Sequence, residues 1–238
     1  MIMIQVFCLA SGSTGNSYAV DDGKTVLLLE AGIPAKKICS GYLKLLPRVA
    51  GCLITHEHQD HSKGAADLAD RGVDLYMTSG TRNMVTKTIH PYRIHIVRAA
   101  EQIKVGSWIV LPFEAEHDAE EPVGFLLASS ITHEKLLFAT DTYFIRYRFS
   151  GVNIFMVECN YSLPILQANI AAGLIPQSLQ GRLLRSHFSM ENLIDFFRAT
   201  DLSEAQKIYL IHASAGNGDK ALFKKEIQRT TGIPVEVF

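Results

Sequence analysis

The sequence of 238 residues lacks three features that would place it in other classes of protein. Its apolar stretches are short and interrupted by charge, so none reaches the roughly 18 residues that a membrane-spanning helix needs. No low-complexity stretch and no linker rich in Pro, Gly or Ser divides the chain, which predicts one domain over residues 1–238. The net charge of -1 argues against a protein that coats nucleic acid with a large basic surface, although a local basic groove remains compatible with it.

Cysteine is also scarce, and its placement indicates no redox or zinc chemistry. The four cysteines show no CxxC spacing and are expected to be buried free thiols: Cys8, Cys39, Cys52 and Cys159. The first residues, Met-Ile-Met-Ile-Gln-Val-Phe, have neither the cationic start nor the small-residue cleavage site of a signal peptide, and they are expected to form a strand. A cytoplasmic location fits these features best.

The sequence contains both short strand patterns and helix patterns. Strands are predicted at residues 3–9, 17–20, 24–29, 51–55, 74–77, 94–98, 107–114, 123–130, 134–138, 153–157, 207–211 and 234–238, with hairpin-turn chemistry at 21–23. Helices are predicted at 34–46, 62–71, 79–88, 189–199 and 219–230. Two groups of strands, each accompanied by helices, predict an α+β fold of two packed sheets with helices outside.

Three of the nine histidines fall within six residues, in the run Thr55-His56-Glu57-His58-Gln59-Asp60-His61 that follows a predicted strand. In an extended loop, His56 and His58 point to the same side and can hold one ion, while Asp60 and His61 can hold a second. Imidazole and carboxylate suit Zn²⁺, Mn²⁺ or Fe. The alternative, a solvent-exposed polar loop, does not explain the HxHxDH order. The pattern also differs from the helical HExxH of zinc proteases.

HxHxDH after a strand resembles the signature of the metallo-β-lactamase superfamily, and further motifs follow in the same order. They are Glu116-His117-Asp118, Phe138-Ala-Thr-Asp141-Thr, and Ile208-Tyr-Leu-Ile-His212-Ala-Ser. The resemblance implies a four-layer αββα sandwich and two divalent ions, Zn or Mn. It implies one ion on His56, His58 and His117, a second on Asp60, His61 and His212, and Asp141 between them. His90, His95 and His133 match no motif and are expected at the surface or in packing.

His187, in Arg185-Ser-His-Phe-Ser189, competes with His212 for the last ligand position. In the nuclease-like branch of the superfamily, a histidine in this context pairs with a glutamate at the end of an earlier strand. Glu158 occupies that place here. The resemblance favours His212 as the ligand, and Glu158 with His187 as a proton-donating pair.

Three features narrow the substrate class. The run Ala10-Ser-Gly-Ser13-Thr14-Gly-Asn16-Ser17 offers small residues, hydroxyls and an amide to a phosphate, so Ser13, Thr14 and Asn16 are predicted to bind substrate. The Glu158–His187 pair favours phosphodiesters. Asn217 and Gly218 precede a helix N-terminus that could face a phosphate.

Together with His-Asp-Ala before Pro-Val-Gly-Phe and with Glu-x-Asn-Tyr, the first run resembles the WalJ (YycJ) group of single-domain metal-dependent exonucleases acting on DNA. The chain departs from the group's pattern at Ser-His-Phe-Ser around His187 and at His-Ala-Ser after the last strand.

The resemblance implies hydrolysis by a two-metal site, in which Asp60 ligates and orients the nucleophile and His187, held by Glu158, protonates the leaving oxygen. DNA is the expected partner, and a membrane is not. The rival readings are a hydrolase of a small ester, thioester, lactone or small phosphodiester, and a metal-binding module without catalysis. The candidate cations for a nucleic-acid backbone are Arg146, Arg148, Arg182 and Arg185, and the alternative for each is an ordinary solvated surface residue.

Overall fold

The computed structural model describes residues 3–85 and 88–238, and these residues separate into two compact units. Unit 1 consists of Met1–Glu114 and Ala119–Glu134, and unit 2 consists of Ala115–Asp118 and Lys135–Phe238. The prediction of a single domain over residues 1–238 stays a prediction. In the described part of the chain, no helix combines the length and the apolar character that crossing a membrane requires.

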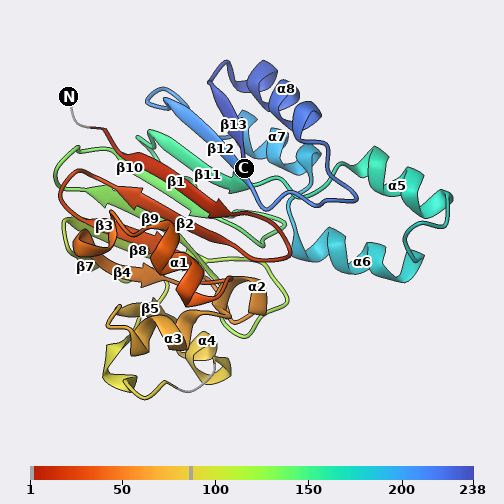
Figure 1. Ribbon diagram of the computed structural model, residues 1–238. Helices are drawn as coiled ribbons and strands as arrows, with labels where there is room; N and C mark the ends of the chain where they lie inside the picture. Colours follow the sequence, from red (N-terminus) through yellow and green to blue (C-terminus); the bar gives the residue numbers. More distant parts are fainter. Residues whose placement is uncertain (1–2, 86–87) are drawn as a thin grey trace. The chain divides into compact units, whose positions relative to one another are not determined.

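Unit 1 contains a mixed sheet in the order β1-β2-β3-β4-β5-β6 (Figure 1). Strands β1 to β3 are antiparallel neighbours, whereas β3 to β6 run parallel. A second group, β7-β8-β9, is antiparallel. The strand bounds are β1 Gln5–Ala10, β2 Ser17–Asp21, β3 Val26–Leu29, β4 Val49–Leu53, β5 Leu75–Met77, β6 Ile94–Ile96, β7 Ile103–Val105, β8 Trp108–Glu114 and β9 Val123–Ser129.

The helices of unit 1 are short. They are α1 Ala35–Gly41, α2 Gln59–Ser62, α3 Ala65–Asp70 and α4 Ser79–Met84, with 3-10 turns at η1 Leu46–Arg48 and η2 Pro91–Arg93. The predicted helix at 34–46 is wrong in length, because α1 ends at Gly41. The predicted helix at 62–71 is two helices, α2 and α3, which meet at Lys63 and Gly64. The predicted helix at 79–88 extends partly outside the described residues, since 86 and 87 are not among them.

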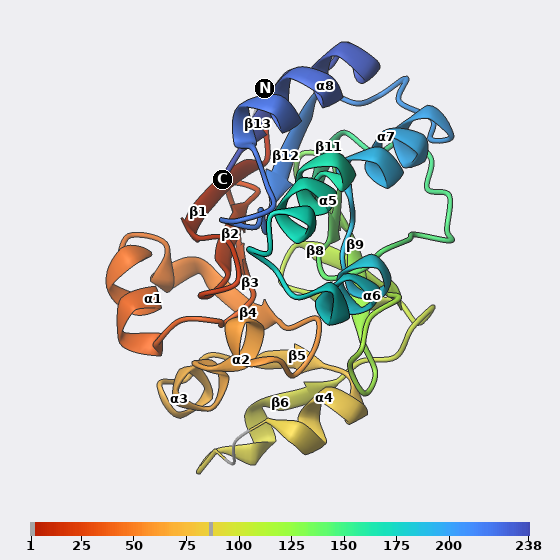
Figure 2. The same ribbon diagram turned by 90° about the vertical axis from the view of Figure 1, so that its right-hand side faces the viewer.

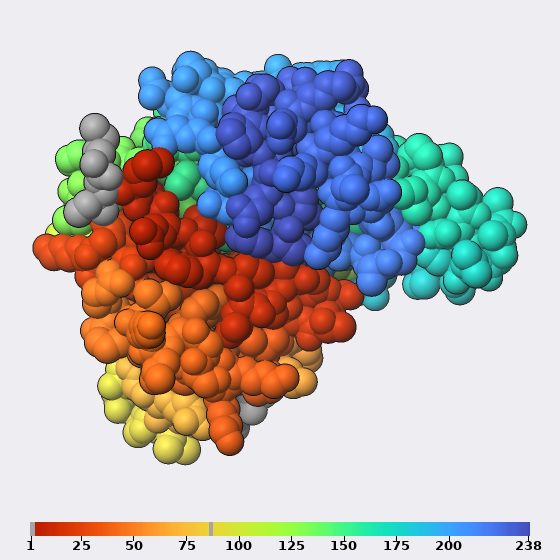
Figure 3. Space-filling view, turned by 45° about the horizontal axis from the view of Figure 1, so that its top comes forward, coloured from red at the N-terminus to blue at the C-terminus, as the bar shows by residue number. Residues whose placement is uncertain are grey.

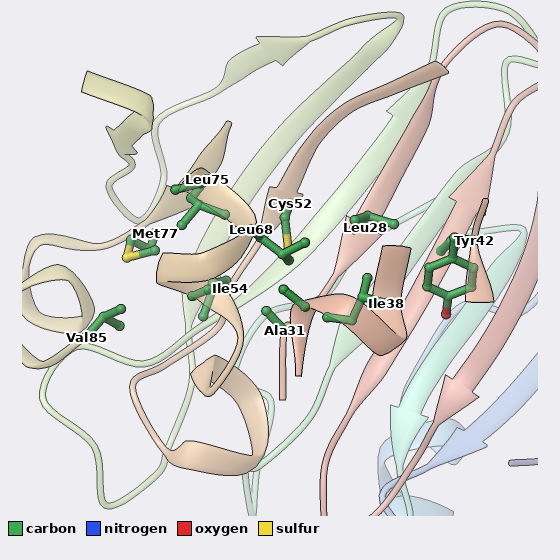
Figure 4. Close-up of a cluster of buried hydrophobic side chains, with 14 of the residues drawn as sticks. Leu28, Ala31, Ile38, Tyr42, Cys52, Ile54, Leu68, Leu75, Met77 and Val85 are labelled. Atoms are coloured by element: carbon green, nitrogen blue, oxygen red, sulfur yellow. The ribbon is translucent and has the colours of Figure 1, made fainter. Parts of the chain in front are cut away.

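The core of unit 1 forms where α1 and α3 cover the parallel strands. Figure 4 shows this cluster, in which Ile38 of α1 and Leu68 of α3 meet apolar side chains of the sheet. The strand residues in it include Leu28, Cys52, Leu75 and Met77, and Ile54 follows the end of β4. Burial of one such side chain contributes roughly 1.5–3 kcal/mol, so this cluster fixes the end of β4 from which the histidine run departs.

Hydrogen bonds at the turn between β2 and β3 connect the β1–β6 sheet of unit 1 to the strand group β7-β8-β9. Asp22 is fully buried, and its carboxylate accepts hydrogen bonds from the hydroxyls of Ser107 (2.5 Å) and Ser129 (2.9 Å). The backbone N–H groups of Lys24 and Thr25 donate to its other oxygen at 2.9 Å. The predicted hairpin at 21–23 is therefore confirmed, and its aspartate also anchors β8 and β9.

Unit 2 is built on parallel strands in the order β10-β11-β12-β13. Their bounds are β10 Lys135–Ala139, β11 Ile154–Glu158, β12 Lys207–Ile211 and β13 Val235–Val237, and the helices are α5 Leu163–Ala171, α6 Gln177–Ser186, α7 Met190–Arg198 and α8 Lys220–Thr231. Helices α7 and α8 pack on each other and α8 packs on β13, while α5 and α6 project away from them (Figure 3). Helices α5, α6 and α7 lie in the crossover between the parallel strands β11 and β12, and α8 lies in the crossover between β12 and β13.

Candidate metal and phosphodiester site

Unit 1 supplies four potential metal ligands from six consecutive residues. His56 follows the end of β4, His58 is the N-cap residue of α2, and Asp60 and His61 lie in the first turn of that helix. The expectation that all four lie on an extended loop is therefore wrong for Asp60 and His61. The helical turn, closed by the hydrogen bond from His61 N to His58 O at 2.9 Å, brings the ring of His61 to that of His56.

The four side chains lie close together. Nε2 of His56 is 3.1 Å from Nδ1 of His58, and the rings of His56 and His61 are 4.3 Å apart. Nε2 of His61 is 3.4 Å from Oδ2 of Asp60. His56 and His61 are buried to 1% and 0% exposure, so their ring nitrogens are protected from bulk water. Such a set of imidazoles and a carboxylate has the donor chemistry of a Zn²⁺ or Mn²⁺ site.

The Ser/Gly loop between β1 and β2 holds this turn in place through Asn16. The backbone N–H and the side-chain amide of Asn16 both donate to the carbonyl of Asp60, at 2.8 and 3.1 Å. Gly32 N donates to Asn16 O at 2.8 Å, and a Cβ at Gly32 would lie 1.7 Å from that same Asp60 carbonyl. Asn16 is fully buried, whereas Ser13 and Thr14 are exposed at the tip of the loop.

Glu30 is a site residue that the sequence reasoning missed. It follows β3, is fully buried, and has a backbone φ of 66°. Its Oε1 lies 3.6 Å from Nδ1 of His61, and Thr55 N approaches Oε2 at 3.5 Å. Burial raises the pKa of the Glu30 carboxyl, and the charge of His61 does not offset this effect. A buried acid directly after a strand, in Leu29-Glu30-Ala31-Gly32, is the signal that could have identified it.

In unit 2, His117 and Asp118 are joined to the end of α6. Nδ1 of His117 is 2.9 Å from the carbonyl oxygen of Ser186, and Asp118 accepts hydrogen bonds from Ser186 Oγ (3.1 Å) and Arg182 Nε (2.9 Å). With Nδ1 engaged there, Nε2 of His117 lies 3.5 Å from Oδ2 of Asp141. Burial lowers the pKa of His117, which Asp141 only partly opposes, so the ring is held in its neutral, metal-binding form.

Asp141 and His212 follow the parallel strands β10 and β12 and share an unusual backbone conformation. Their φ angles are 47° and 55°, in the left-handed region that non-glycine residues rarely adopt. Such strain costs about 1–3 kcal/mol for each residue and is typical of functional sites. It brings Nδ1 of His212 to 3.4 Å from Oδ1 of Asp141.

Glu158, the last residue of β11, has hydrogen-bonding partners at both of its carboxylate oxygens. Its Oε1 is 2.8 Å from Nδ1 of His187 and 3.0 Å from Nδ1 of His212, and Asn160 Nδ2 donates to it at 3.2 Å. Its Oε2 accepts from the backbone of Phe188 (3.1 Å) and Thr142 (3.4 Å). The predicted pairing of Glu158 with His187 is present in the structure.

The charge states follow from these contacts. Burial alone would raise the pKa of Glu158, but the charge and hydrogen bond of His187 hold it below its ordinary value. Burial opposes the charged form of His187, yet Glu158 outweighs it and raises the pKa of the imidazole. Glu158 is thus a carboxylate, and His187 retains a proton at a higher pH than a free histidine.

The donors of unit 2 fit a metal as well. Asp141, Glu158, His187 and His212 each offer a ligand atom, and these atoms all lie within 4.8 Å of one another. His187 and His212 stack with 5.6 Å between ring centroids, and His187 keeps 18% of its side chain exposed while His212 keeps 2%. Both histidines therefore belong to this donor set, and the choice of His212 rather than His187 as the metal ligand stays a prediction.

The remaining sequence predictions fall outside the two donor sets. Arg146 forms an ion pair with Glu116, Arg182 pairs with Asp118, and Arg185 is exposed on α6. The predicted phosphate site at the start of α8 is wrong, because the Asp219 carboxylate itself accepts from the first amides of that helix. His90, His95 and His133 lie away from both sets, His95 stacking on Tyr76. The four cysteines are free thiols as predicted, but the predicted burial is correct only for Cys52 and Cys159, since Cys8 and Cys39 are partly exposed.

Comparison with known proteins decides the family. Residues 30–213 match the family described as Beta-lactamase superfamily domain. The chain belongs to the metallo-β-lactamase superfamily. Its curated relatives include the exodeoxyribonuclease YycJ of Bacillus anthracis, 30% identical over 93% of this chain and 86% of the relative. The exodeoxyribonuclease WalJ of Streptococcus pneumoniae (strain D39 / NCTC 7466) is 29% identical over 90% of this chain and 83% of its own.

Solved structures agree with this superfamily assignment. The metallo-β-lactamase fold protein YhfI from Bacillus subtilis superposes with a TM-score of 0.73 over 99% of this chain and 97% of its own, at 13% identity. Unliganded yeast PDE1 superposes with a TM-score of 0.70 over 100% and 98%, at 10% identity. At these identities the likeness concerns the fold alone, and it confirms the predicted α+β, αββα metallo-β-lactamase fold.

Proposed function

We propose that the protein is a two-metal-dependent phosphodiesterase that degrades DNA from its ends. The observation that carries this proposal is the Glu158–His187 pair, because it places a partly exposed imidazole, hydrogen-bonded to a buried carboxylate, in the donor set of unit 2. A hydrolase of phosphodiesters needs such an acid to protonate the leaving oxygen. The relatives named exodeoxyribonuclease support DNA as the substrate.

The ligands are proposed from the motif order of the superfamily. His56, His58 and His117 would hold one ion, Asp60, His61 and His212 would hold the other, and Asp141 would serve both. The imidazole and carboxylate chemistry of both donor sets fits this role. When bound, divalent cations supply an activated water near neutral pH and a counter-charge for phosphate oxygens.

The chain's own groups perform the remaining tasks. Nδ1 of His187 is bonded to Glu158, which leaves Nε2 to donate its proton to the oxygen that departs when the P–O bond breaks. Asp60, with its carbonyl held by Asn16, would orient the attacking water. The exposed hydroxyls of Ser13 and Thr14 would bind a phosphate oxygen, and the predicted contact of Asn16 with substrate remains part of this proposal.

The test is hydrolysis of a 5′-labelled DNA duplex and of bis-p-nitrophenyl phosphate, with Zn²⁺ or Mn²⁺ restored separately to chelated protein. We expect mononucleotides from the duplex and nitrophenol from the model ester, with no turnover before metal is restored. Cleavage of a thioester or lactone without cleavage of any phosphodiester would overturn the proposed substrate class and leave the family assignment intact. The proposed place of action is the cytoplasm.

A further inference from the structure

The segment that follows Asp141 has an unusual composition. Between β10 and β11 the chain runs Thr142-Tyr-Phe-Ile-Arg-Tyr-Arg-Phe149 as a loop without helix or strand (Figure 2). Four of its eight residues are aromatic, in a chain with 9% aromatic residues, and two are arginine. No carboxylate occurs between Asp141 and Glu158. Aromatic rings interleaved with cations are typical of surfaces that bind single-stranded nucleic acid.

Hydrogen bonds fix the first part of this loop to the donor set of unit 2. Thr142 N donates to Glu158 Oε2 at 3.4 Å, and Thr142 Oγ1 donates to the carbonyl of Phe144 at 2.8 Å. The backbone of Glu116 is hydrogen-bonded to the same turn: Glu116 N donates to Thr142 Oγ1 (2.9 Å), and Tyr143 N donates to Glu116 O (3.3 Å). The rings of Tyr143 and Phe144 are therefore held close to Asp141.

These two rings form one wall of a hollow of about 410 Å³. Its other wall is α7, the helix that begins directly after His187, and its lining residues are Tyr143, Phe144, Arg148, Asn192, Asp195 and Phe196. The volume lies within the range of about 300–1,000 Å³ for small-molecule pockets. One wall begins two residues after Asp141 and is tied to Glu158 through Thr142 N, and the other begins three residues after His187, so both walls adjoin the donor set of unit 2 along the chain.

The chemistry of the lining matches one nucleobase better than an apolar side chain. Phe144 is 46% exposed, so a large ring face is available for stacking. Asn192 and Asp195 offer an amide and a carboxylate, which can pair with the polar edge of a base. Asp195 Oδ1 pairs with Arg198 at 3.1 Å, which leaves Oδ2 to accept from a base, and a carboxylate disfavours a phosphate at the same place, so the base would lie in the hollow. Arg148, whose guanidinium donates to the carbonyls of Ile145 and Tyr147, would meet the phosphate outside.

We infer that the hollow between the Tyr143–Phe149 loop and α7 binds an unpaired nucleobase of the DNA strand and so positions the adjoining phosphodiester for cleavage. The inference rests on the proposed function and adds a residue-level subsite to it. Tyr143 and Phe144 stack on the base, Asp195 accepts from an exocyclic amine, and Arg148 binds the backbone. This subsite also explains how a chain of nearly neutral charge holds a polyanion: stacking on rings does not require net positive charge.

The first experiment measures binding of a short fluorescein-labelled single-stranded oligonucleotide with nuclease-resistant phosphorothioate linkages to the metal-loaded protein, so that turnover does not interfere. Phe144→Leu keeps an apolar side chain but removes the ring, and it should raise Kd about tenfold, the effect of losing one stacked base. The loss should appear in KM for the oligonucleotide rather than in kcat. Arg148→Gln should reduce the salt dependence of log Kd by about 0.7. Tyr92→Leu, at an exposed aromatic of unit 1, is the matched control and should change neither.

The second experiment gives a direct signal of stacking. Phe144→Trp restores a ring, so it should bind like the wild type, and its indole fluorescence should be quenched when the oligonucleotide is added. The chain's single tryptophan, Trp108, is fully buried and provides a constant background. A rise in Kd for Phe144→Leu together with quenching in Phe144→Trp establishes the subsite.

Each other outcome is decisive as well. If wild-type protein degrades DNA, but Phe144→Leu and Tyr143→Leu both bind normally and Phe144→Trp is not quenched, the subsite is wrong and the proposed function stands. If bis-p-nitrophenyl phosphate is cleaved while no oligonucleotide binds, the subsite is again wrong and the enzyme is a small-molecule phosphodiesterase. If no phosphodiester is cleaved, the proposed function fails, and quenching in Phe144→Trp alone decides whether the hollow binds a base.

Discussion

Both units place a fully buried glutamate at the end of a strand beside a histidine, but they treat that glutamate differently. Glu158 in unit 2 has five hydrogen-bonding neighbours within 3.4 Å, including two imidazoles. Glu30 in unit 1 has His61 at 3.6 Å and a backbone N–H at 3.5 Å. The pKa of Glu158 is therefore lowered, whereas burial raises that of Glu30. The same residue type at the end of a strand is thus held as a carboxylate by several hydrogen bonds in one unit, and is buried with few hydrogen bonds and a raised pKa in the other.

The largest expected effect concerns the metals themselves. Chelation should abolish hydrolysis and destabilise the fold by about 2.7 kcal/mol if the ion was present at 100 times its Kd. For a chain of this size the corresponding shift in Tm is about 5–10 °C. Calorimetry checks the shift, and hydrogen exchange shows whether amides of both units lose protection. Loss of protection in one unit alone would mean that only that unit's donors bind metal.

The second prediction separates two histidines that contact the same oxygen of Glu158. His187→Ala should retain both metals and lose about 10²–10⁴-fold in kcat, because it removes the proton donor. His212→Ala should weaken the second metal instead. Metal analysis after dialysis, paired with single-turnover kinetics, distinguishes the two. The opposite pattern would show that His187 is the ligand and His212 the donor.

The third prediction tests the two glutamates directly. Glu158→Gln should lower kcat strongly, because an amide cannot hold the protonated form of His187. Glu30→Gln should instead weaken metal binding about 10- to 100-fold with a smaller effect on kcat at saturating metal, as expected for a group that only orients His61. Competition with a chromophoric chelator measures the affinities. Equal losses of kcat in both variants at saturating metal would remove the distinction between the units.

The smallest effect concerns a buried acid of unit 1 that is remote from the histidine run. Asp22→Asn should destabilise the protein by about 1–3 kcal/mol, because it disturbs hydrogen bonds from Ser107 and Ser129. Burial would raise the pKa of Asp22, but its four hydrogen-bond donors hold it below the ordinary value of 3.8. The stabilisation is thus present above pH 4 and is lost as the pH falls through the lowered pKa.

Urea unfolding at neutral pH and below about pH 4 checks this prediction. The difference between wild type and Asp22→Asn should shrink at the lower pH. Asp67→Asn, in an exposed i,i+4 pair with Arg71, is the matched control and should change stability by less than about 1 kcal/mol at either pH. A difference for Asp22→Asn that does not depend on pH would mean that its charge contributes nothing.

The part of the molecule that could be predicted from the sequence is the part whose signals are local. The HxHxDH run, the strands β8 to β12, and the amphipathic helices α7 and α8 were predicted because each pattern lies within a short window. Helices α5 and α6 and strand β7 were missed. In α5 the apolar residues are not gathered on one face, so no periodic pattern marks it. Helix α6 does carry Leu179, Leu183 and Leu184 at helical spacing, and this local signal was overlooked.

Contacts between distant segments could not be predicted in the same way. Glu30 lies 31 residues before His61, and nothing in its immediate sequence shows that a histidine will face it. The Ser186 carbonyl that orients His117 is 69 residues away from it. Such partners are fixed by strand order and helix placement, so the motif resemblance supplied the donors while the structure was needed for the groups that hold them.

The double hold of Asn16 on the carbonyl of Asp60 has a thermodynamic consequence. These two hydrogen bonds join the loop that carries Ser13 and Thr14 to the turn that carries Asp60 and His61, so we expect binding at the first to affect binding at the second. By linkage, if a ligand on the loop raises the affinity of that turn for a cation by some factor, the cation raises the affinity of the loop for its ligand by the same factor. Titrating metal with and without inorganic phosphate measures that shared factor, and a factor of one would mean that the two sites are energetically independent.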